Sequence, residues 1–343
     1  MKFGLHFKTV VLFFVFLYTV QSVVVSQSIH FSDAFSSHLV LNPANTGRFN
    51  GNWRAVGIYR QQGEQLTNHY TTGYFSFEHP FYYKNEKIDV GLYFVRDNSS
   101  HGTLPVNRLN LSVGHGVRLG LKSMLHAGIQ LAGVHKQVSW RSITFPDQYN
   151  REIGGFDPSL PSEDVREPSG TFYVDAGLGL LYSYQWNKGV SSVGYSMQQV
   201  NRPNESFFEI SHRLSPKHLF HAKGDVQIAK DLFVVPTFVG IYSHGVLETL
   251  MGSHVGVQLH DWLTQRNNVT VGAHVRNLSY VDARSMVYSF GMTWQYWSFM
   301  VSYEMDVKSG SAARYNRSAL EFGLIYKLPS TDLTRKTIPC ERY

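Results

Sequence analysis

The chain has 343 residues, of which only 16% are charged and 14% are aromatic. Soluble domains carry roughly 25% charged residues, and disordered chains combine high charge with few aromatic residues, so the composition argues against a disordered chain. The formal net charge of +6 rests on few charged residues and does not indicate a nucleic-acid-binding protein. The single cysteine, Cys340, excludes an intramolecular disulfide and any cysteine-based metal cluster.

The first 26 residues have the organisation of a secretory signal peptide. Lys2 and Lys8 precede an apolar run at 10–20, and Ser26 provides a small residue before Gln27, where we expect cleavage. The alternative is an N-terminal membrane anchor, but the run is shorter than the ~20 residues that a spanning helix needs. No later apolar run reaches that length. The exported chain therefore either stays free or crosses a membrane as strands.

After residue 27 the sequence alternates with a period of two, which is typical of β-strands. At 285–307, apolar and aromatic residues alternate with Ser, Gly, Thr and single charges. Small polar residues on the second face suit the lumen of a closed barrel, and aromatic clusters such as Tyr296 and Trp297 match an interfacial girdle. We predict an all-β fold, a transmembrane antiparallel β-barrel of the outer-membrane type. The alternative is a secreted sandwich or propeller. The chain lacks a clear repeat of about 40–50 residues, which disfavours a propeller.

Fourteen segments fit this alternation, and an even number is the rule for bacterial barrels. Bacterial barrels also have short periplasmic turns and longer loops on the cell surface. If the chain starts in the periplasm, the two longest connections, 138–169 and 200–215, both fall on the cell surface. The predicted strands are 53–61, 68–79, 87–96, 105–118, 122–137, 170–185, 189–199, 216–228, 232–242, 247–259, 268–276, 285–294, 297–306 and 317–327.

This pattern divides the chain into a signal peptide at 1–26, an N-terminal segment at 27–52, a barrel at 53–328 and a periplasmic tail at 329–343. Pro43 restricts Asn42 to an extended conformation and marks a non-strand region before the barrel. We expect the segment 27–52 to fold into the lumen as a plug or to lie along the periplasmic rim. A flexible leader is the alternative.

Four stretches occur in a recognisable order along the mature chain. The first is Leu41-Asn42-Pro43-Ala44 with Gly47, followed by Trp53 and by a first strand that contains Tyr59-Arg60. The second is 139–156, which contains Asp147-Gln148, and the third is 183–201 with Pro203. In the third stretch Gly194, Tyr195 and Ser196 depart from the usual residues. The fourth is Ser302-Tyr303-Glu304 together with 320–326.

This series resembles the PorP/SprF family of outer-membrane proteins, which accompany the type IX secretion and gliding systems of Bacteroidetes. The resemblance implies an outer-membrane protein that supports secretion or surface attachment of a partner, such as a large adhesin, carrying a C-terminal sorting domain. It also implies contact with periplasmic ring or motor components and with outer-membrane lipid. It implies no catalysis.

Two regions are candidates for partner binding. The surface connection 138–169 combines charges of both signs with aromatic residues, which suits an interface rim and its anchors. The alternative is a merely solvated loop. The candidate residues there are Trp140, Arg141, Phe145, Asp147, Gln148, Tyr149 and Phe156.

The tail at 329–343 is the second candidate. Arg335 and Lys336 could contact periplasmic components, and the family's members often end in a similar Pro-Cys-aromatic pattern. Cys340 could instead pair with a cysteine of a partner, because an odd cysteine in an oxidising compartment suggests an intermolecular bond. The third reading is a frayed end.

The sequence offers no support for a cofactor or for a catalytic or metal site. The sixteen histidines show no paired ligand spacing, and neither Gly-x-Gly pattern, at 114–116 and 177–179, lies between a strand and a helix. No nucleophile elbow is present, although an outer-membrane phospholipase or protease stays open as an alternative. A porin or substrate-specific channel is the other alternative, disfavoured by lumen faces poor in charge.

Overall fold

The computed structural model describes residues 30–63, 70–84, 86–99, 104–138, 145–157, 159–161, 169–207, 211–259, 267–279, 283–307 and 318–329. The predicted signal peptide lies outside these ranges. So do Trp140 and Arg141, and the tail residues Arg335, Lys336 and Cys340. Their predicted roles stay predictions.

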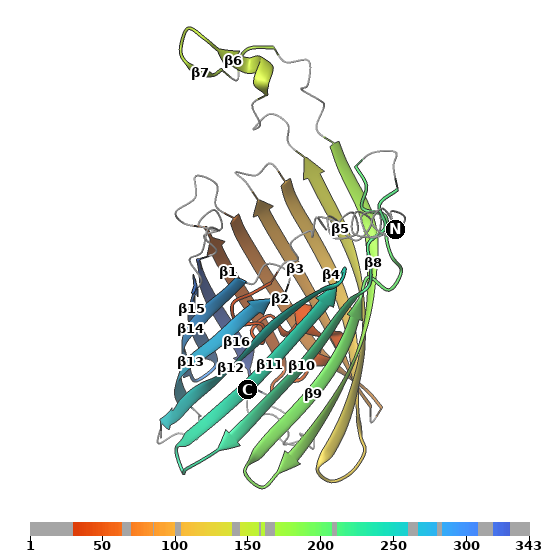
Figure 1. The fold of residues 1–343 in the computed structure, drawn as a ribbon. Helices are drawn as coiled ribbons and strands as arrows, with labels where there is room; N and C mark the ends of the chain where they lie inside the picture. The colour runs from red at the N-terminus through yellow and green to blue at the C-terminus, as the bar shows by residue number, and fades with distance from the viewer. Residues whose placement is uncertain are drawn as a thin grey trace, which may run out of the picture. The chain divides into compact units, whose positions relative to one another are not determined.

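Fourteen of the described strands close into one antiparallel barrel, which confirms the predicted fold class (Figure 1). The first strand closes the ring against the last, in a register from Trp53↔Leu328 to Gln62↔Ala319. The barrel strands are β1 (Trp53–Gln62), β2 (Tyr70–Tyr83), β3 (Glu86–Ser99), β4 (Leu104–Arg118), β5 (Ser123–Val138), β8 (Ser169–Trp186), β9 (Gly189–Gln198), β10 (Lys217–Gln227), β11 (Leu232–Ser243), β12 (Val246–Leu259), β13 (Asn267–Leu278), β14 (Ala283–Trp294), β15 (Trp297–Asp306) and β16 (Ala319–Leu328).

Each predicted segment coincides with one of these strands, with differences at the ends. The largest difference is at β2, which continues past Pro80 to Tyr83. The predicted strand ends at residue 79, directly before this proline, and a proline donates no ladder hydrogen bond. The pairing with β3 nevertheless runs on to Tyr83↔Glu86, so the loss of one donor does not end the ladder.

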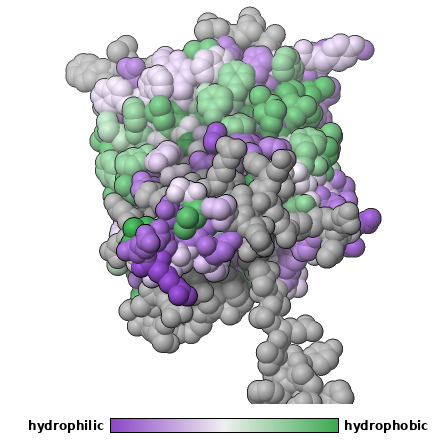
Figure 2. All heavy atoms as spheres, turned by 90° about the horizontal axis from the view of Figure 1, so that it is seen from above, coloured by the Kyte–Doolittle hydropathy of each residue, from purple (hydrophilic) through white to green (hydrophobic). Residues whose placement is uncertain are grey.

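The barrel has an apolar outer wall and a polar inner wall. Met286, Tyr288 and Phe290 on β14 are exposed, whereas Ser285, Val287 and Ser289 between them are buried inside. Figure 2 shows apolar side chains gathered over the outer wall. In the described ranges no helix has both the length and the hydropathy to cross a membrane. An apolar exterior around a polar interior is the pattern of a transmembrane barrel.

The two ends of the barrel differ in their connections. At the end where β1 begins, tight turns at residues 187–188 and 295–296 join β8 to β9 and β14 to β15. The opposite end has the long connections between β5 and β8, β9 and β10, and β15 and β16. Outer-membrane barrels have short periplasmic turns and longer outer loops, so we call these the periplasmic end and the surface end.

Residues 31–50 lie inside the barrel, and we call them the lumenal segment. It contains the short helix α2 (His38–Leu41) and the 3-10 turn η1 (Pro43–Asn45). In Figure 1 it is the red chain surrounded by the strands. Leu41 packs in one cluster with inward residues of four strands, namely Leu219, Val239, Leu250 and Val287. The apolar core is therefore built between this segment and the inner wall.

Candidate functional site

A row of glycines on the inner wall receives the turn at Asn42 and Pro43. Gly114, Gly128 and Gly179 are direct neighbours across β4, β5 and β8. A Cβ atom on Gly128 would overlap the Pro43 carbonyl, and one on Gly179 would overlap the Asn42 side chain. Glycine is required at positions 128 and 179, because the Pro43 backbone and the Asn42 side chain lie too close to the wall for a Cβ atom. At Gly114 the contact is tight but less severe, since a Cβ atom would lie 3.1 Å from Thr46.

Asn42 anchors this turn to the wall. Its Oδ1 accepts a hydrogen bond from the Ala44 backbone N–H at 2.8 Å, which caps η1. Its Nδ2 donates to the carbonyls of Leu180, at 3.1 Å, and Tyr195, at 3.2 Å. Asn42 is fully buried, so its polar atoms need these partners.

The inner wall also binds the backbone of α2. The Ser196 hydroxyl donates to the Leu41 carbonyl at 2.7 Å, and the Gln198 Nε2 donates to the Val40 carbonyl, also at 2.7 Å. These two carbonyls lie at the end of a short helix, where no intrahelical donor is available. Ser196 stands where the sequence departs from the family's usual residues, and it still supplies a contact to the segment.

A buried cluster of ionisable groups holds the periplasmic half of the segment. The Glu78 carboxylate accepts hydrogen bonds from Arg54 Nε at 2.8 Å and from the Gly47 backbone N–H at 2.9 Å. The His38 Nε2 lies 2.7 Å from the same carboxylate. Burial lowers the pKa of His38, and the charge of Arg54 lowers it further. His38 is therefore neutral near pH 7, and the ion pair is formed by Arg54 and Glu78.

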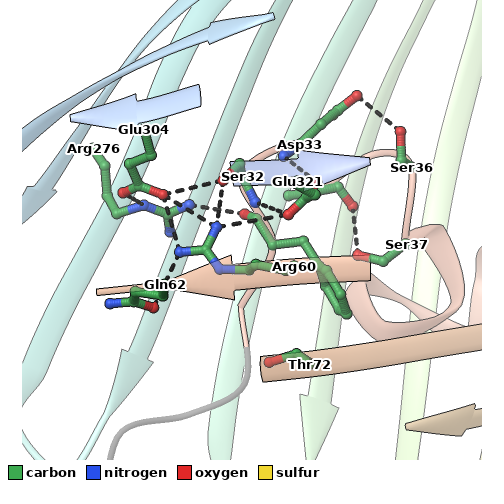
Figure 3. Close-up of polar contacts among 12 residues, drawn as sticks. Ser32, Asp33, Ser36, Ser37, Arg60, Gln62, Thr72, Arg276, Glu304 and Glu321 are labelled. Carbon is green, nitrogen blue, oxygen red and sulfur yellow. Dashed lines mark hydrogen bonds and ion pairs between the residues drawn. The ribbon is translucent and has the colours of Figure 1, made fainter. Parts of the chain in front are cut away.

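A second buried cluster holds the start of the segment at the surface end (Figure 3). The Glu321 carboxylate accepts hydrogen bonds from the backbone N–H groups of Ser32, at 2.7 Å, and Asp33, at 3.2 Å. Arg276 donates from Nη2 to the Phe31 carbonyl at 2.8 Å. Arg60 also donates to the Ser32 hydroxyl, and Glu304 accepts from it. Side chains of β13 and β16 thus bind the backbone of residues 31–33, and side chains of β1 and β15 bind the Ser32 side chain.

Ion pairs join the side chains of this second cluster. Arg60 lies 3.2 Å from Glu304 and 3.6 Å from Glu321. Arg276 lies 2.8 Å from Glu304 and also pairs with Glu248. Buried ion pairs add little net stability, but removal of one partner is strongly destabilising because it leaves a buried charge. The cluster therefore fixes where the segment lies rather than simply strengthening the fold.

The surface connection between β5 and β8 contains a small hairpin, formed by η4 (Pro146–Gln148), β6 (Tyr149–Asn150) and β7 (Gly155–Phe156). Gln148 is buried within it; its Oε1 accepts from the Phe145 N–H at 3.0 Å, and its Nε2 donates to the Leu160 carbonyl at 2.8 Å. Tyr149 and Phe156 pack edge to face with ring centroids 5.4 Å apart. Their exposed fractions are nevertheless 48% and 52%.

The structure thus brings Phe145, Asp147, Gln148, Tyr149 and Phe156 together on one hairpin. Gln148 is buried and fixes the shape of the hairpin from inside. It would therefore affect partner binding through the shape of the hairpin and not by touching the partner. Asp147 is exposed on the turn.

Sequence reasoning missed the lumenal contacts as a site, although four of their residues, Asn42, Arg60, Glu304 and Glu321, lie in the stretches that carry the family resemblance. For Arg60, Glu304 and Glu321 the signal was present, since each is a charged residue on an alternating strand. The expectation that the lumen faces are poor in charge was wrong: Arg54, Arg60, Glu78, Glu248, Arg276, Glu304 and Glu321 are all buried there. Across the described ranges, no group of three or more His, Cys, Asp or Glu side chains is placed to hold a metal ion.

Comparison with known families gives one match that covers most of the chain. The model of the family described as type IX secretion system membrane protein PorP/SprF matches residues 23–326. No curated protein matches the sequence.

Several solved structures share the fold. A TodX deltaS2S3 mutant monoaromatic hydrocarbon channel matches with a TM-score of 0.50 and 10% identity, over 84% of this chain and 93% of that chain. CymD, a monoaromatic hydrocarbon channel, matches with a TM-score of 0.48 and 11% identity, over 89% and 96%. The Pseudomonas putida toluene transporter TodX matches with a TM-score of 0.45 and 9% identity, over 88% and 94%. At these identities the likeness concerns the barrel fold alone.

Proposed function

Because the chain belongs to the PorP/SprF family of type IX secretion system membrane proteins, we propose that this outer-membrane barrel supports secretion or cell-surface attachment of a partner protein with a C-terminal sorting domain. The partner binds at the surface end, on the connection that contains the aromatic hairpin. The protein has no catalytic activity of its own in this proposal.

The observation that carries the proposal is the occupied lumen. The lumenal segment is bound near the periplasmic end, where Lys87 donates to the Gly47 carbonyl at 2.8 Å, and at the surface end, where Glu321 holds Ser32. It makes contacts with strands on opposite sides of the ring, for example β9 through Ser196 and β16 through Glu321. A barrel whose interior is bound to its own chain must meet a large partner outside the lumen.

The hairpin offers the features that such a contact needs. Tyr149 and Phe156 form an aromatic pair, and the charged residues Asp147, Arg151 and Glu152 are exposed on the same hairpin. Interfaces take most of their binding energy from a few aromatic anchors and use polar residues at the rim. Gln148 holds the hairpin in one shape, which lowers the entropy that is lost when the partner binds.

The double substitution Tyr149→Ala/Phe156→Ala tests this proposal. We expect the barrel to insert and to migrate on unboiled gels as the wild type does, while surface display of the partner falls by about tenfold or more, as for loss of an aromatic anchor pair. The matched control is Ile153→Ala, since Ile153 is 65% exposed in the turn of the same hairpin. Normal display in the double variant, and in a variant lacking residues 141–166, would show that this connection does not bind the partner.

A porin or substrate-specific channel is the second candidate, favoured only by the barrel fold that the chain shares with hydrocarbon channels. A channel would require the lumenal segment to leave its site, which breaks the contacts to Glu78 and Glu321. Single-channel conductance of the purified wild-type protein in planar bilayers distinguishes the two functions. We expect a closed barrel, and a large steady conductance would favour the channel.

A further inference from the structure

The turns at the periplasmic end carry a run of unpaired positive charges. Five basic residues lie on four of these turns: Lys84 between β2 and β3, Arg118 and Lys122 between β4 and β5, Lys188 between β8 and β9, and Lys230 between β10 and β11. All five are exposed, and within the described part of the chain none of them forms an ion pair. We call these five residues the basic arc.

The turns of the arc lie side by side. The Gln185 backbone N–H donates to the Lys122 carbonyl at 2.7 Å, and the Gln227 N–H donates to the Lys188 carbonyl at 2.8 Å. Lys122 Nζ also donates to the Asn187 side chain at 3.4 Å. Every second turn of an antiparallel barrel lies at the same end, as the ribbon in Figure 1 shows. The charges on these four neighbouring turns therefore add up along one part of the rim.

Few negative charges offset the arc. The acidic residues on the same turns are Glu86, which lies 3.7 Å from His115, and Asp231, which is half-buried. Lys87 is also basic, but it pairs with Asp89 at 3.1 Å and is not counted in the arc. The surface therefore attracts a negatively charged partner, and with the Debye length at about 8 Å in physiological salt this attraction acts mainly on contact.

An apolar side chain stands within the arc. Leu121 is 97% exposed at the tip of the turn between Arg118 and Lys122. An exposed apolar residue that is flanked by charges has the arrangement of an interface anchor with its rim. Two of the five basic residues, Lys84 and Lys188, follow the aromatic residues Tyr83 and Trp186 along the chain, and such aromatic residues mark the membrane–water interface. Lys84 Nζ lies 5.4 Å from the centroid of the Tyr83 ring and so stays close to that interface. Leu121 and Lys122 instead lie on a turn beyond the ends of β4 and β5, where a folded protein is a better partner than lipid head groups.

We propose that the basic arc is the docking surface for a folded periplasmic protein that presents an acidic patch with an apolar pocket for Leu121. The inference rests on the proposed role in secretion, since membership of the machine implies contact with its other components, and it gives the contact a place and a chemistry. The surface hairpin and the basic arc then serve two partners at opposite ends of one barrel.

Binding of purified components tests this proposal. The barrel is reconstituted in nanodiscs of zwitterionic lipid, and each purified periplasmic component of the same organism's type IX machine is added in turn at low and at physiological salt. We expect one component to bind, with weaker binding at higher salt. The variant Lys84→Glu/Arg118→Glu/Lys188→Glu/Lys230→Glu should lose affinity by about tenfold or more, because like charges then face each other. Leu121→Asp should weaken binding independently.

The matched control reverses three exposed charges at the surface end, Arg96→Glu, Arg202→Glu and Arg213→Glu, and should bind as the wild type does. Heat-modifiable migration on gels checks that each variant is folded. The proposal is overturned if no component binds, if charge reversal of the arc leaves binding unchanged, or if it changes only the retention of anionic phospholipid. This assay measures binding of a periplasmic component and not surface display. Its outcome is therefore independent of the display test with the Tyr149 and Phe156 variant.

Discussion

Ser32 and Glu321 are 289 residues apart in the sequence, and the backbone N–H of Ser32 donates to the Glu321 carboxylate at 2.7 Å. This bond joins the start of the lumenal segment to the last strand of the barrel. Glu321 is fully buried and also lies 3.6 Å from Arg60 on the first strand. The residue therefore connects the segment to the seam at which the barrel closes.

Substitution of Glu321 should release the surface half of the segment. In Glu321→Ala the N–H groups of Ser32 and Asp33 lose their acceptor and Arg60 loses one of its two carboxylate partners. Removal of one partner of a buried ion pair costs about 3–5 kcal/mol. We expect a free energy of unfolding in urea that is lower by about this amount, together with faster exchange of the backbone amides of residues 31–33. The exposed Glu86→Ala is the control, and equal unfolding midpoints in the two variants would contradict the assigned role.

A side chain on the glycine row should displace the segment from the wall. Gly128→Val places a Cβ atom against the Pro43 carbonyl and adds two methyl groups to it, and overpacking of this kind costs about 1–3 kcal/mol. We expect the barrel to form but the lumen to open, which planar-bilayer conductance would detect. Gly57→Val is the matched control, because a Cβ atom at Gly57 on β1 would meet nothing within 4 Å. A closed barrel in both variants would mean that the row does not position the segment.

Protonation of His38 should couple stability to pH. Burial and the charge of Arg54 lower its pKa below the ordinary 6.5, so the folded chain binds this proton less readily than the unfolded chain. Stability from this group is fully present above about pH 6.5 and decreases as the pH falls below that value. The unfolding free energy of wild type should therefore drop more between about pH 7.5 and about pH 5.5 than that of His38→Gln. Equal losses in the two proteins would exclude His38 as a source of the pH dependence.

The tail, which lies outside the described residues after 329, gives a prediction with three separable outcomes. We expect truncation after Leu328 to leave insertion intact and to reduce secretion of the partner, through loss of the contact made by Arg335 and Lys336. A mixed species on non-reducing gels that disappears in Cys340→Ser would instead show an intermolecular disulfide. Wild-type secretion by both variants would show that the tail is only a chain end.

The sequence by itself determined the strands that form the barrel wall. Alternation with period two can be read locally, because successive side chains of a strand point to opposite faces whatever the rest of the chain does. All fourteen strands, the apolar exterior and the unequal connections follow from it. The family also followed, since short motifs such as Asn42-Pro43 and Tyr59-Arg60 keep their order along the chain.

Only the tertiary structure decided what those motifs do. The sequence left a plug and a rim position open for the N-terminal segment, and no local pattern links Ser32 to Glu321 or Asn42 to Gly179. Such contacts depend on closure of the ring, which brings strands from both ends of the chain around one short segment. The same closure collects Lys84, Arg118, Lys188 and Lys230 on one rim, although in the sequence they are isolated charges separated by whole hairpins.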